Sequence, residues 1–524
     1  MSAPSEVLDA LNPNVAWLLW RAAERAGHRP AVTERGSAVS YAGLLDRATA
    51  VARALEGAGL VAGDRVVILL ERGAEAVAAY FGALAAGAIA VPVIDTLKPR
   101  QLDHILMHSG ARYLITAAEV LARHPYTIGH ARVVDVHQIG AGDHTFQPLG
   151  RVGSDVAQIV YTSGSTGLAK GVTVSHANLW AATRAVVSYL GITGADRIAS
   201  LLPFSFVYGL SQMLCAVSAG ACLVVERSPL LVHAVETLRA EQVTVLAAIP
   251  SLWLRLLQVP AFRDAPLRDL RVMTNAGGHL PIEVVRKLRR AHSHAHLYLM
   301  YGLTEVLRST YLPPEEVDRR PTSIGRAIPG GEVYVVREDG TPAAAGEIGE
   351  LVYRGPTVTL GYWNDPELTA KVFRPNPFRT PGAPDTERVV FSGDLVRADA
   401  AGFLYFVSRS DRIIKTLGYR VGPDEIVSVL HASGEVAEAL VAGEPDEARG
   451  ERIVAYVVLS EGGSVERLQT FCRRELPRYM EPSRFEVRDA LAVLANGKPD
   501  LTAVRAARDG VDCCRVTALA SRGA

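Results

Sequence analysis

Apolar and polar positions alternate along this chain in blocks that predict a parallel α/β sheet followed by a β-rich subdomain. Between residues 41 and 249, short runs such as RVVILL and CLVVE are separated by longer stretches rich in alanine and leucine. Strands that alternate with helices in this way are typical of parallel sheets. From about residue 325 to 362, short strand-like runs are broken by glycine, which predicts a smaller antiparallel piece.

The rest of the chain predicts a second, smaller domain. A loop rich in proline and polar residues spans residues 374–388, and from about residue 411 the pattern becomes a compact α+β segment with mixed charge. We therefore expect a large N-terminal domain over residues 1–410 and a small C-terminal domain over residues 411–524.

Composition narrows the function classes. The 524 residues include 55 Lys and Arg against 55 Asp and Glu, so no overall positive field favours nucleic acid or an anionic membrane surface. The 5 cysteines have no CxxC spacing, which favours neither a disulfide framework nor a zinc site. The N-terminus lacks the regions of a signal peptide, and glycine and proline interrupt the uncharged residues 76–94. We expect a cytoplasmic protein without a membrane span.

The strongest chemical signal is YTSGSTGLAKG, residues 161–171, which follows an apolar run and precedes a helical stretch. Its glycines, hydroxyl residues and lysine predict a loop that wraps a polyphosphate, with a plain flexible loop as the alternative. A Walker A loop has glycine directly before its lysine, whereas Lys170 follows Ala169. The predicted phosphate-binding residues besides Lys170 are Thr162, Ser163, Gly164, Ser165, Thr166 and Gly167.

This loop resembles the phosphate-binding signature of the superfamily of acyl-CoA synthetases, peptide-synthetase adenylation domains and firefly-type luciferases. Further motifs of that superfamily follow in its order, namely NAGGHL, YGLTE, SGDL, SRSDRIIKTLGYRVGPDEI and NGKPD. The resemblance covers nearly the whole chain. It implies an AMP-forming acid–thiol ligase that uses ATP and Mg²⁺ to activate a carboxylic acid as its acyl adenylate.

The same resemblance implies roles for individual residues at the nucleotide. Glu305 would hold the magnesium ion, and Thr304 would contact a phosphate oxygen. A hydroxyl beside a carboxylate suits a magnesium ion that bridges phosphate oxygens. Asp394 would accept hydrogen bonds from the ribose hydroxyls. Lys170 would lie at the phosphates. The other residues implied for the nucleotide site are Gly277, Gly278, Tyr301, Arg409 and Arg420.

In this superfamily an adenylating half-reaction precedes a thioester-forming one, and the resemblance implies residues that serve each of them. Lys498 would hold the reacting carboxylate against the α-phosphate in the first step. Rotation of the small domain about Asp411 would then bring Gly418 to the channel of the thiol acceptor, either CoA or the phosphopantetheine of a carrier protein. Two alternatives stay open. One is an adenylating enzyme that uses a nitrogen nucleophile or activates nitrite, and the other is a non-catalytic nucleotide-binding paralogue, which the intact motif residues disfavour.

Substrate choice is expected to depend on LPFSFVYGLSQ, residues 202–212, which in the superfamily lines the acid pocket with the glycine pair of NAGGHL. Relatives that activate amino acids carry an aspartate there, because a buried unpaired ammonium group is costly. Phe206, Val207 and Tyr208 occupy this place without an acid, which favours an apolar or aromatic acid over an α-amino acid. Arg308, just past YGLTE, is expected at the pocket, with a structural salt bridge as the alternative. The sequence does not indicate an oligomeric state.

Overall fold

The computed structural model describes residues 13–506 except 124, 125, 127, 143, 144, 163–168, 383, 410–413, 417, 418, 447–449, 477 and 495–498. The chain divides into two units, one of Met1–Leu280 with Val284–Phe406 and the other of Val407–Ala524 with Pro281–Glu283. Asp411, the expected hinge, lies outside the described residues. The hinge and the domain boundaries at residues 410 and 411 therefore stay predictions. None of the described helices is both long and apolar enough to cross a membrane.

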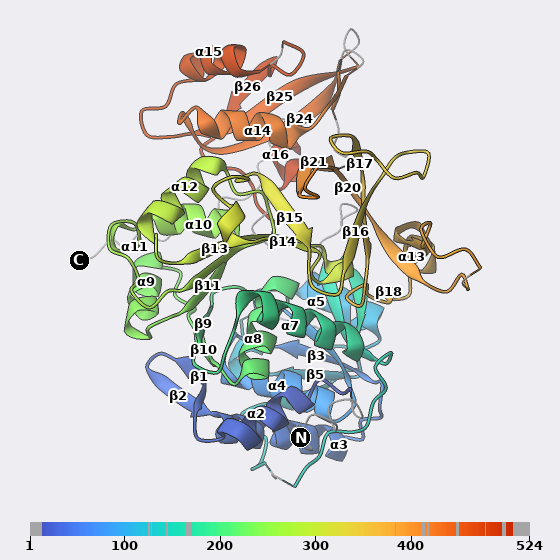
Figure 1. Ribbon diagram of the computed structural model, residues 1–524. Helices are drawn as coiled ribbons and strands as arrows, with labels where there is room; N and C mark the ends of the chain where they lie inside the picture. Colours follow the sequence, from blue (N-terminus) through green and yellow to red (C-terminus); the bar gives the residue numbers. More distant parts are fainter. Residues whose placement is uncertain are drawn as a thin grey trace. The chain divides into compact units, whose positions relative to one another are not determined.

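A seven-stranded sheet in the described part of the first unit is mostly parallel, as its alternating sequence predicts (Figure 1). The uncharged stretch at residues 76–94 forms the buried helix α4 (Ala74–Ala85) and strand β4. Gly82 lets α4 pack closely on α3 (Tyr41–Gly57), because a Cβ atom there would lie 2.4 Å from the Ala48 carbonyl oxygen. In sheet order the strands are β18 (Gly361–Tyr362), β8 (Lys170–Ser175), β7 (Val156–Thr162), β4 (Ile89–Val93), β3 (Arg65–Leu69), β5 (Tyr113–Thr116) and β6 (Arg132–Asp135).

The predicted phosphate loop connects two antiparallel strands. Strands β7 and β8 pair antiparallel, with Thr162 opposite Lys170 at the two ends of the predicted loop. The helical stretch expected after this loop is present, but a strand lies between the two. The alternating residues KGVTVS form strand β8, with Val172 and Val174 fully buried, and helix α7 (His176–Leu190) begins only after it.

A longer sheet carries the predicted site residues Tyr301, Asp394 and Arg409 in its strands. In its described part, β1, β10, β9, β11, β12 and β13 run parallel, and the strands beyond β13 run antiparallel, as residues 325–362 predict. Helices α9 to α12 gather beside β11–β13 around buried Trp253 and Phe262 (Figure 1). In sheet order the strands are β16 (Glu332–Val336), β17 (Ile348–Arg354), β20 (Arg388–Ala398), β21 (Leu404–Arg409), β15 (Ser323–Ala327), β14 (Thr310–Leu312), β13 (His296–Tyr301), β12 (Val272–Asn275), β11 (Val245–Ala248), β9 (Arg197–Ser200), β10 (Cys222–Val225), β1 (Pro30–Glu34) and β2 (Ser37–Ser40), with β19 (Phe373–Pro375) beside β20. The remaining α-helices described in the first unit are α2 (Trp17–Ala26), α5 (Pro99–Ser109), α6 (Ala118–Leu121), α8 (Val207–Ala219), α9 (Leu231–Ala240), α10 (Pro250–Leu257), α11 (Pro260–Arg263), α12 (Ile282–Ala291) and α13 (Pro366–Val372).

The second unit is the α+β segment that the sequence predicts. Successive residues of its central strands point to opposite faces, so Val441 packs with helices α14 and α15 while Leu440 packs with Val504 of α16. The fold is thus mixed α/β with a large N-terminal and a small C-terminal part, and the predicted fold class is confirmed. The elements of this unit are β22 (Ile414–Thr416), β23 (Tyr419–Val421), α14 (Pro423–Ala432), β24 (Val436–Asp446), β25 (Gly450–Leu459), α15 (Val465–Glu475), β26 (Arg484–Val487) and α16 (Leu501–Ala506).

Candidate active site

Three of the predicted segments follow parallel strands of the long sheet, β12 and its neighbour β13, and β9, which β11 separates from β12. Strand β12 ends at Asn275, the first residue of NAGGHL, and β13 ends at Tyr301, the first residue of YGLTE. Strand β9 ends at Ser200, just before the predicted pocket segment of residues 202–212. In the register of the sheet, Asn275 lies opposite both Ala248 and Leu299. Because the carboxyl ends of parallel strands meet at one edge, the sheet gathers these motifs where ligands bind in open α/β sheets.

Asp394 is joined to this edge by a hydrogen bond. It lies in strand β20 and is only 6% exposed, and the Tyr301 hydroxyl donates to its Oδ2 atom. The backbone amide of Asp394 donates to the Ser392 hydroxyl at 3.1 Å, which fixes the local backbone. A buried carboxylate of this kind accepts hydrogen bonds strongly. Its chemistry therefore fits the ribose hydroxyls that the resemblance implies as its partners.

Thr304 and Glu305 lie in a short 3-10 turn, η1 (Thr304–Val306), which Gly302 and Leu303 separate from the end of β13. The Tyr362 hydroxyl donates to Glu305 Oε1 at 2.5 Å, and the Thr359 amide donates to the Glu305 carbonyl oxygen at 3.0 Å. Tyr362 belongs to β18, which pairs with β8. It therefore links Glu305 of YGLTE to the strand that begins at Lys170. The adjacent hydroxyl and carboxylate are a suitable donor set for Mg²⁺. Sequence reasoning missed Tyr362, which lies 57 residues from its partner in a segment without a recognised motif.

A histidine pair supports the start of β8. His104 Nε2 donates to the carbonyl oxygen of Ala169, next to Lys170, at 2.9 Å. One helical turn along α5, His108 Nδ1 lies 2.9 Å from the Tyr161 hydroxyl oxygen on β7. Burial, and then the neighbouring His104, lower the pKa of His108, which favours its neutral form. No sequence pattern indicates this pair, because only the fold brings α5 beside the hairpin.

The predicted pocket segment forms the start of helix α8. Val207 is its first residue and half-buried, Phe206 precedes it, and Tyr208 is buried. The Tyr208 hydroxyl donates to the Thr274 carbonyl oxygen at 2.7 Å, and burial raises the pKa of Tyr208 far above its usual value. Tyr208 is therefore a neutral, fixed part of the cluster at the sheet edge.

The glycine pair of NAGGHL lies close to helix α10. Gly277 has a φ of +84°, a conformation that favours glycine. A Cβ atom at Gly278 would lie 3.2 Å from Pro250 Cγ, the first residue of α10. The backbone at Gly278 can therefore lie closer to Pro250 than the backbone of a larger residue could.

Arg308 lies against Tyr208. Its side chain is buried, at 4% exposure, and its guanidinium carbon lies 4.7 Å from the centre of the Tyr208 ring. No described carboxylate forms an ion pair with it, and its Nε and Nη2 atoms make no hydrogen bond to any described residue. The salt bridge considered as an alternative is thus absent from the described part of the chain.

Of the remaining predicted residues, Thr162 lies in the first unit, Arg409 and Arg420 lie in the second unit, and the others lie outside the described residues. Arg409 is exposed at the end of β21, and Arg420 lies in β23 opposite Lys415, with only its backbone described. Thr162 ends β7. The predicted residues that lie outside the described part are Ser163, Gly164, Ser165, Thr166, Gly167, Asp411, Gly418 and Lys498.

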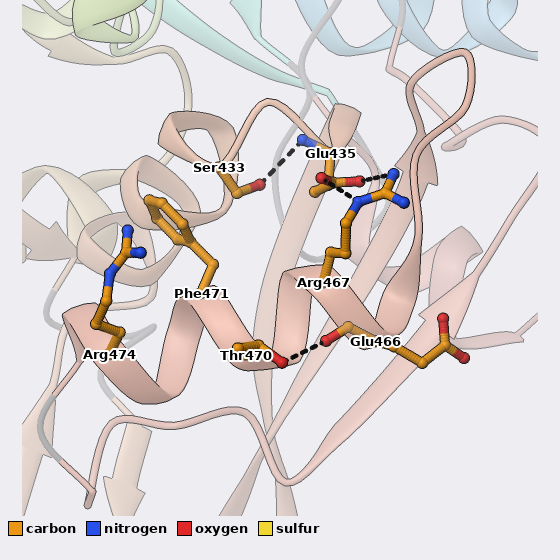
Figure 2. A pocket seen from close by; sticks show the side chains of 7 residues that line it. All are labelled: Ser433, Glu435, Glu466, Arg467, Thr470, Phe471 and Arg474. Atoms are coloured by element: carbon orange, nitrogen blue, oxygen red, sulfur yellow. Dashed lines mark hydrogen bonds and ion pairs between the residues drawn. The ribbon is translucent and has the colours of Figure 1, made fainter.

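A hollow of about 340 Å³ lies on the second unit and carries none of the motif residues (Figure 2). Its Arg467 and Glu435 form an ion pair at 2.7 Å, so the charges there neutralise each other. We do not assign it to the reaction. The residues that line it are Ser433, Glu435, Glu466, Arg467, Thr470, Phe471 and Arg474.

Comparison with known proteins identifies relatives along most of the chain. Residues 19–363 match the model of the AMP-binding enzyme family, and residues 425–498 match its C-terminal domain. Novobiocin biosynthesis protein H of Streptomyces niveus is 34% identical over 493 residues, which cover 90% of this chain and 79% of that protein. Gramicidin S synthase 2 of Brevibacillus brevis is 30% identical over 477 residues, which cover 90% of this chain. The match spans only 10% of that much longer protein.

Solved structures agree with these matches. The o-succinylbenzoate CoA synthetase (MenE) of Bacillus subtilis, solved with its acyl-adenylate intermediate, aligns with a TM-score of 0.82 at 26% identity and covers 95% of this chain and 98% of its own. The same synthetase has been solved with ATP and a magnesium ion. With the family model matching well over half of its length, the chain belongs to the family of AMP-binding enzymes.

Proposed function

We propose that the protein activates a carboxylic acid with ATP as an acyl adenylate, releases pyrophosphate and then passes the acyl group to a thiol. The observation that carries this proposal is the gathering of three motifs at one edge of the long sheet, where Tyr301 donates to the buried Asp394. Membership of the AMP-binding enzyme family supports the same reaction. So does the acyl adenylate in the solved o-succinylbenzoate CoA synthetase.

In the first step, a carboxylate oxygen of the substrate attacks the α-phosphorus of ATP and displaces pyrophosphate. Glu305 would hold Mg²⁺, which would neutralise charge on the phosphate oxygens, and Thr304 would contact a phosphate oxygen. Asp394 would accept hydrogen bonds from the ribose hydroxyls and so orient the nucleotide. Lys170, and Lys498 by its register with the superfamily, would supply positive charge where negative charge develops.

The body of the acid would be apolar or aromatic. The buried residues Leu202, Ala247, Ala276 and Met300 form an apolar cluster with Tyr208, and Phe206 and Val207 lie next to it in the chain. None of these residues carries a carboxylate. The ammonium group of an α-amino acid would therefore lack a counter-ion there, at a considerable cost in free energy.

In the second step, a thiol sulfur attacks the acyl carbon, the bond between that carbon and the phosphate oxygen breaks, and AMP leaves. The acceptor would be CoA or the phosphopantetheine of a carrier protein, and no side chain needs to become acylated. The small domain would rotate about Asp411 between the steps, with Gly418 at the thiol channel. The supply of ATP and thiols supports the cytoplasm as the place of the reaction.

A panel of carboxylic acids tests the proposal. Each acid is incubated with ATP and Mg²⁺, with and without CoA. Pyrophosphate release is measured first, and the products are then identified by mass spectrometry. We expect pyrophosphate release that depends on the acid, an acyl adenylate without CoA and an acyl-CoA with it. Nitrite and amines in the same panel test the nitrogen alternatives, and an amide product would correct only the second step. AMP binding without pyrophosphate release from any acid would favour a non-catalytic paralogue.

A further inference from the structure

Arg308 is a buried arginine whose charge has no partner among the described residues. Its side chain is 4% exposed, and its only hydrogen bond to described residues is a long one of 3.5 Å, from Nη1 to the Leu307 carbonyl oxygen. Nε and Nη2 are both buried without an acceptor in the described part of the chain. An ionised group in this state is strongly destabilising unless an anion binds to it. The position therefore calls for a negatively charged ligand group.

The backbone holds Arg308 in place. Leu307 has φ +54° and ψ −54°, and the Arg308 amide donates to the Val306 carbonyl oxygen, which together form a γ-turn of the rare kind with positive φ. The Thr357 hydroxyl donates to the Arg308 carbonyl oxygen at 3.2 Å. Gly302 of YGLTE lies against the same turn, because a Cβ atom there would be 3.3 Å from Arg308 Cα. A strained backbone of this kind persists only where its surroundings fix it. The backbone of Arg308 is therefore held in one position before any ligand binds.

Aromatic side chains surround this charge. The guanidinium lies over the Tyr208 ring. Burial raises the pKa of Tyr189, and the positive charge of Arg308 opposes part of this rise. Tyr189 stacks on Tyr311 with the ring centres 4.3 Å apart. All three tyrosines belong to the cluster that contains the strand-edge residue Met300. Arg308 is thus the cationic member of an apolar and aromatic group at the predicted acid pocket.

We propose that Arg308 binds a second carboxylate, at the far end of the substrate, and that the protein acts on dicarboxylic acids with an apolar or aromatic body. This inference rests on the proposed adenylation. The reacting carboxylate is a poor partner for Arg308, because it loses its charge when it forms the mixed anhydride. A second carboxylate keeps its charge through both steps, and a neutral acceptor would leave the guanidinium uncompensated.

Straight-chain and aromatic monocarboxylic acids, each paired with the dicarboxylic acid of the same carbon skeleton, test this specificity. For the wild-type enzyme we expect kcat/KM for pyrophosphate release to favour the dicarboxylate by about a hundredfold or more, because a site built for a polar group rejects analogues that lack it. Arg308→Met should lower kcat/KM for the dicarboxylate by a similar factor and raise it for the monocarboxylate. Arg308→Lys should retain part of the preference, since it keeps the charge but not the planar fork.

Three further measurements separate this role from a structural one. AMP affinity should be the same in Arg308→Met and wild type, and the variant should melt at a higher temperature without ligand, because a buried unpaired charge has been removed. Arg374→Met is the matched control, since exposed Arg374 lies over the Phe391 ring at 4.3 Å, and it should leave the acid preference unchanged.

Several results would overturn the inference. They are a wild-type preference for monocarboxylates, an equal loss on both acids in Arg308→Met, a weakened AMP affinity, or a lower melting temperature. If monocarboxylates are adenylated and only the preference is wrong, this inference fails and the proposed function stands. If no acid releases pyrophosphate, both fail.

Discussion

Replacing Asp394 by alanine should weaken AMP binding without unfolding the protein. The carboxylate is 6% exposed and already accepts a hydrogen bond from Tyr301, so ribose hydroxyls would meet a preset, charged acceptor. A hydrogen bond to a charged group contributes about 1.5–3 kcal/mol. Losing one such bond raises Kd about tenfold to a hundredfold, since every 1.4 kcal/mol is roughly a factor of ten. Losing two would raise it further.

Calorimetric titration with AMP measures this effect without any chemical step. Asp399→Ala is a matched control, because Asp399 also accepts hydrogen bonds, from the Phe403 and Ala401 amides at 2.9 Å each and from the Tyr405 hydroxyl at 3.0 Å. We expect the control to lose stability and keep its AMP affinity. Tyr301→Phe, which keeps the carboxylate, should weaken AMP binding less than Asp394→Ala. An unchanged Kd in Asp394→Ala, or an equal loss in both aspartate variants, would refute the assignment.

Three other changes have distinct expected results. Val207→Asp should lower kcat/KM for apolar acids more than it lowers ATP affinity. The variant should fold, because an acidic residue is favourable in the first turn of a helix. A turnover of apolar acids equal to that of the wild type would show that Val207 does not line the pocket. Lys498→Ala should slow pyrophosphate release about a hundredfold or more but use presynthesised acyl adenylate and CoA near the wild-type rate, and equal loss of both steps in a folded variant would contradict this division. Asp196→Asn should destabilise the fold by about 1–3 kcal/mol at pH 7, because Arg271 donates to Asp196 at 2.7 and 2.6 Å. Burial alone would raise the pKa of Asp196, but the Arg271 hydrogen bonds hold it below its usual value, so this stability is complete above the unfolded pKa and is lost as the pH falls through the folded one. In denaturant titrations the gap between wild type and variant should therefore close in acid, and a constant gap would refute the linkage.

The gathering of the motifs could be predicted from the sequence, because each motif follows an apolar run that forms a strand. Asn275 and Tyr301 end adjacent parallel strands, and parallel strands bring the residues after them to one edge of the sheet. The same patterning predicted the mostly parallel sheet and the change to antiparallel strands after residue 325. These features depend on local periodicity, which a single sequence carries.

Contacts between distant segments could not be predicted in this way. Strand β8 was missed because a short alternating run beside a glycine-rich loop gives a weak signal, and its partner β7 determines its direction. The hydrogen bond from Tyr362 to Glu305 and the placing of Arg308 over Tyr208 join residues far apart in the chain. A sequence shows that Arg308 is charged, but its burial without a partner among the described residues follows only from packing.

The central claim is that a carboxylate oxygen of the substrate attacks the α-phosphorus of ATP. Incubating the enzyme with ATP, Mg²⁺, CoA and an acid labelled with oxygen-18 in its carboxylate tests this claim most directly. When the thiol attacks the acyl carbon, the oxygen that formed the anhydride stays on the phosphate. Mass spectrometry should therefore find one labelled oxygen in AMP and none in pyrophosphate. Unlabelled AMP, or formation of ADP with the label in phosphate, would contradict an acyl adenylate.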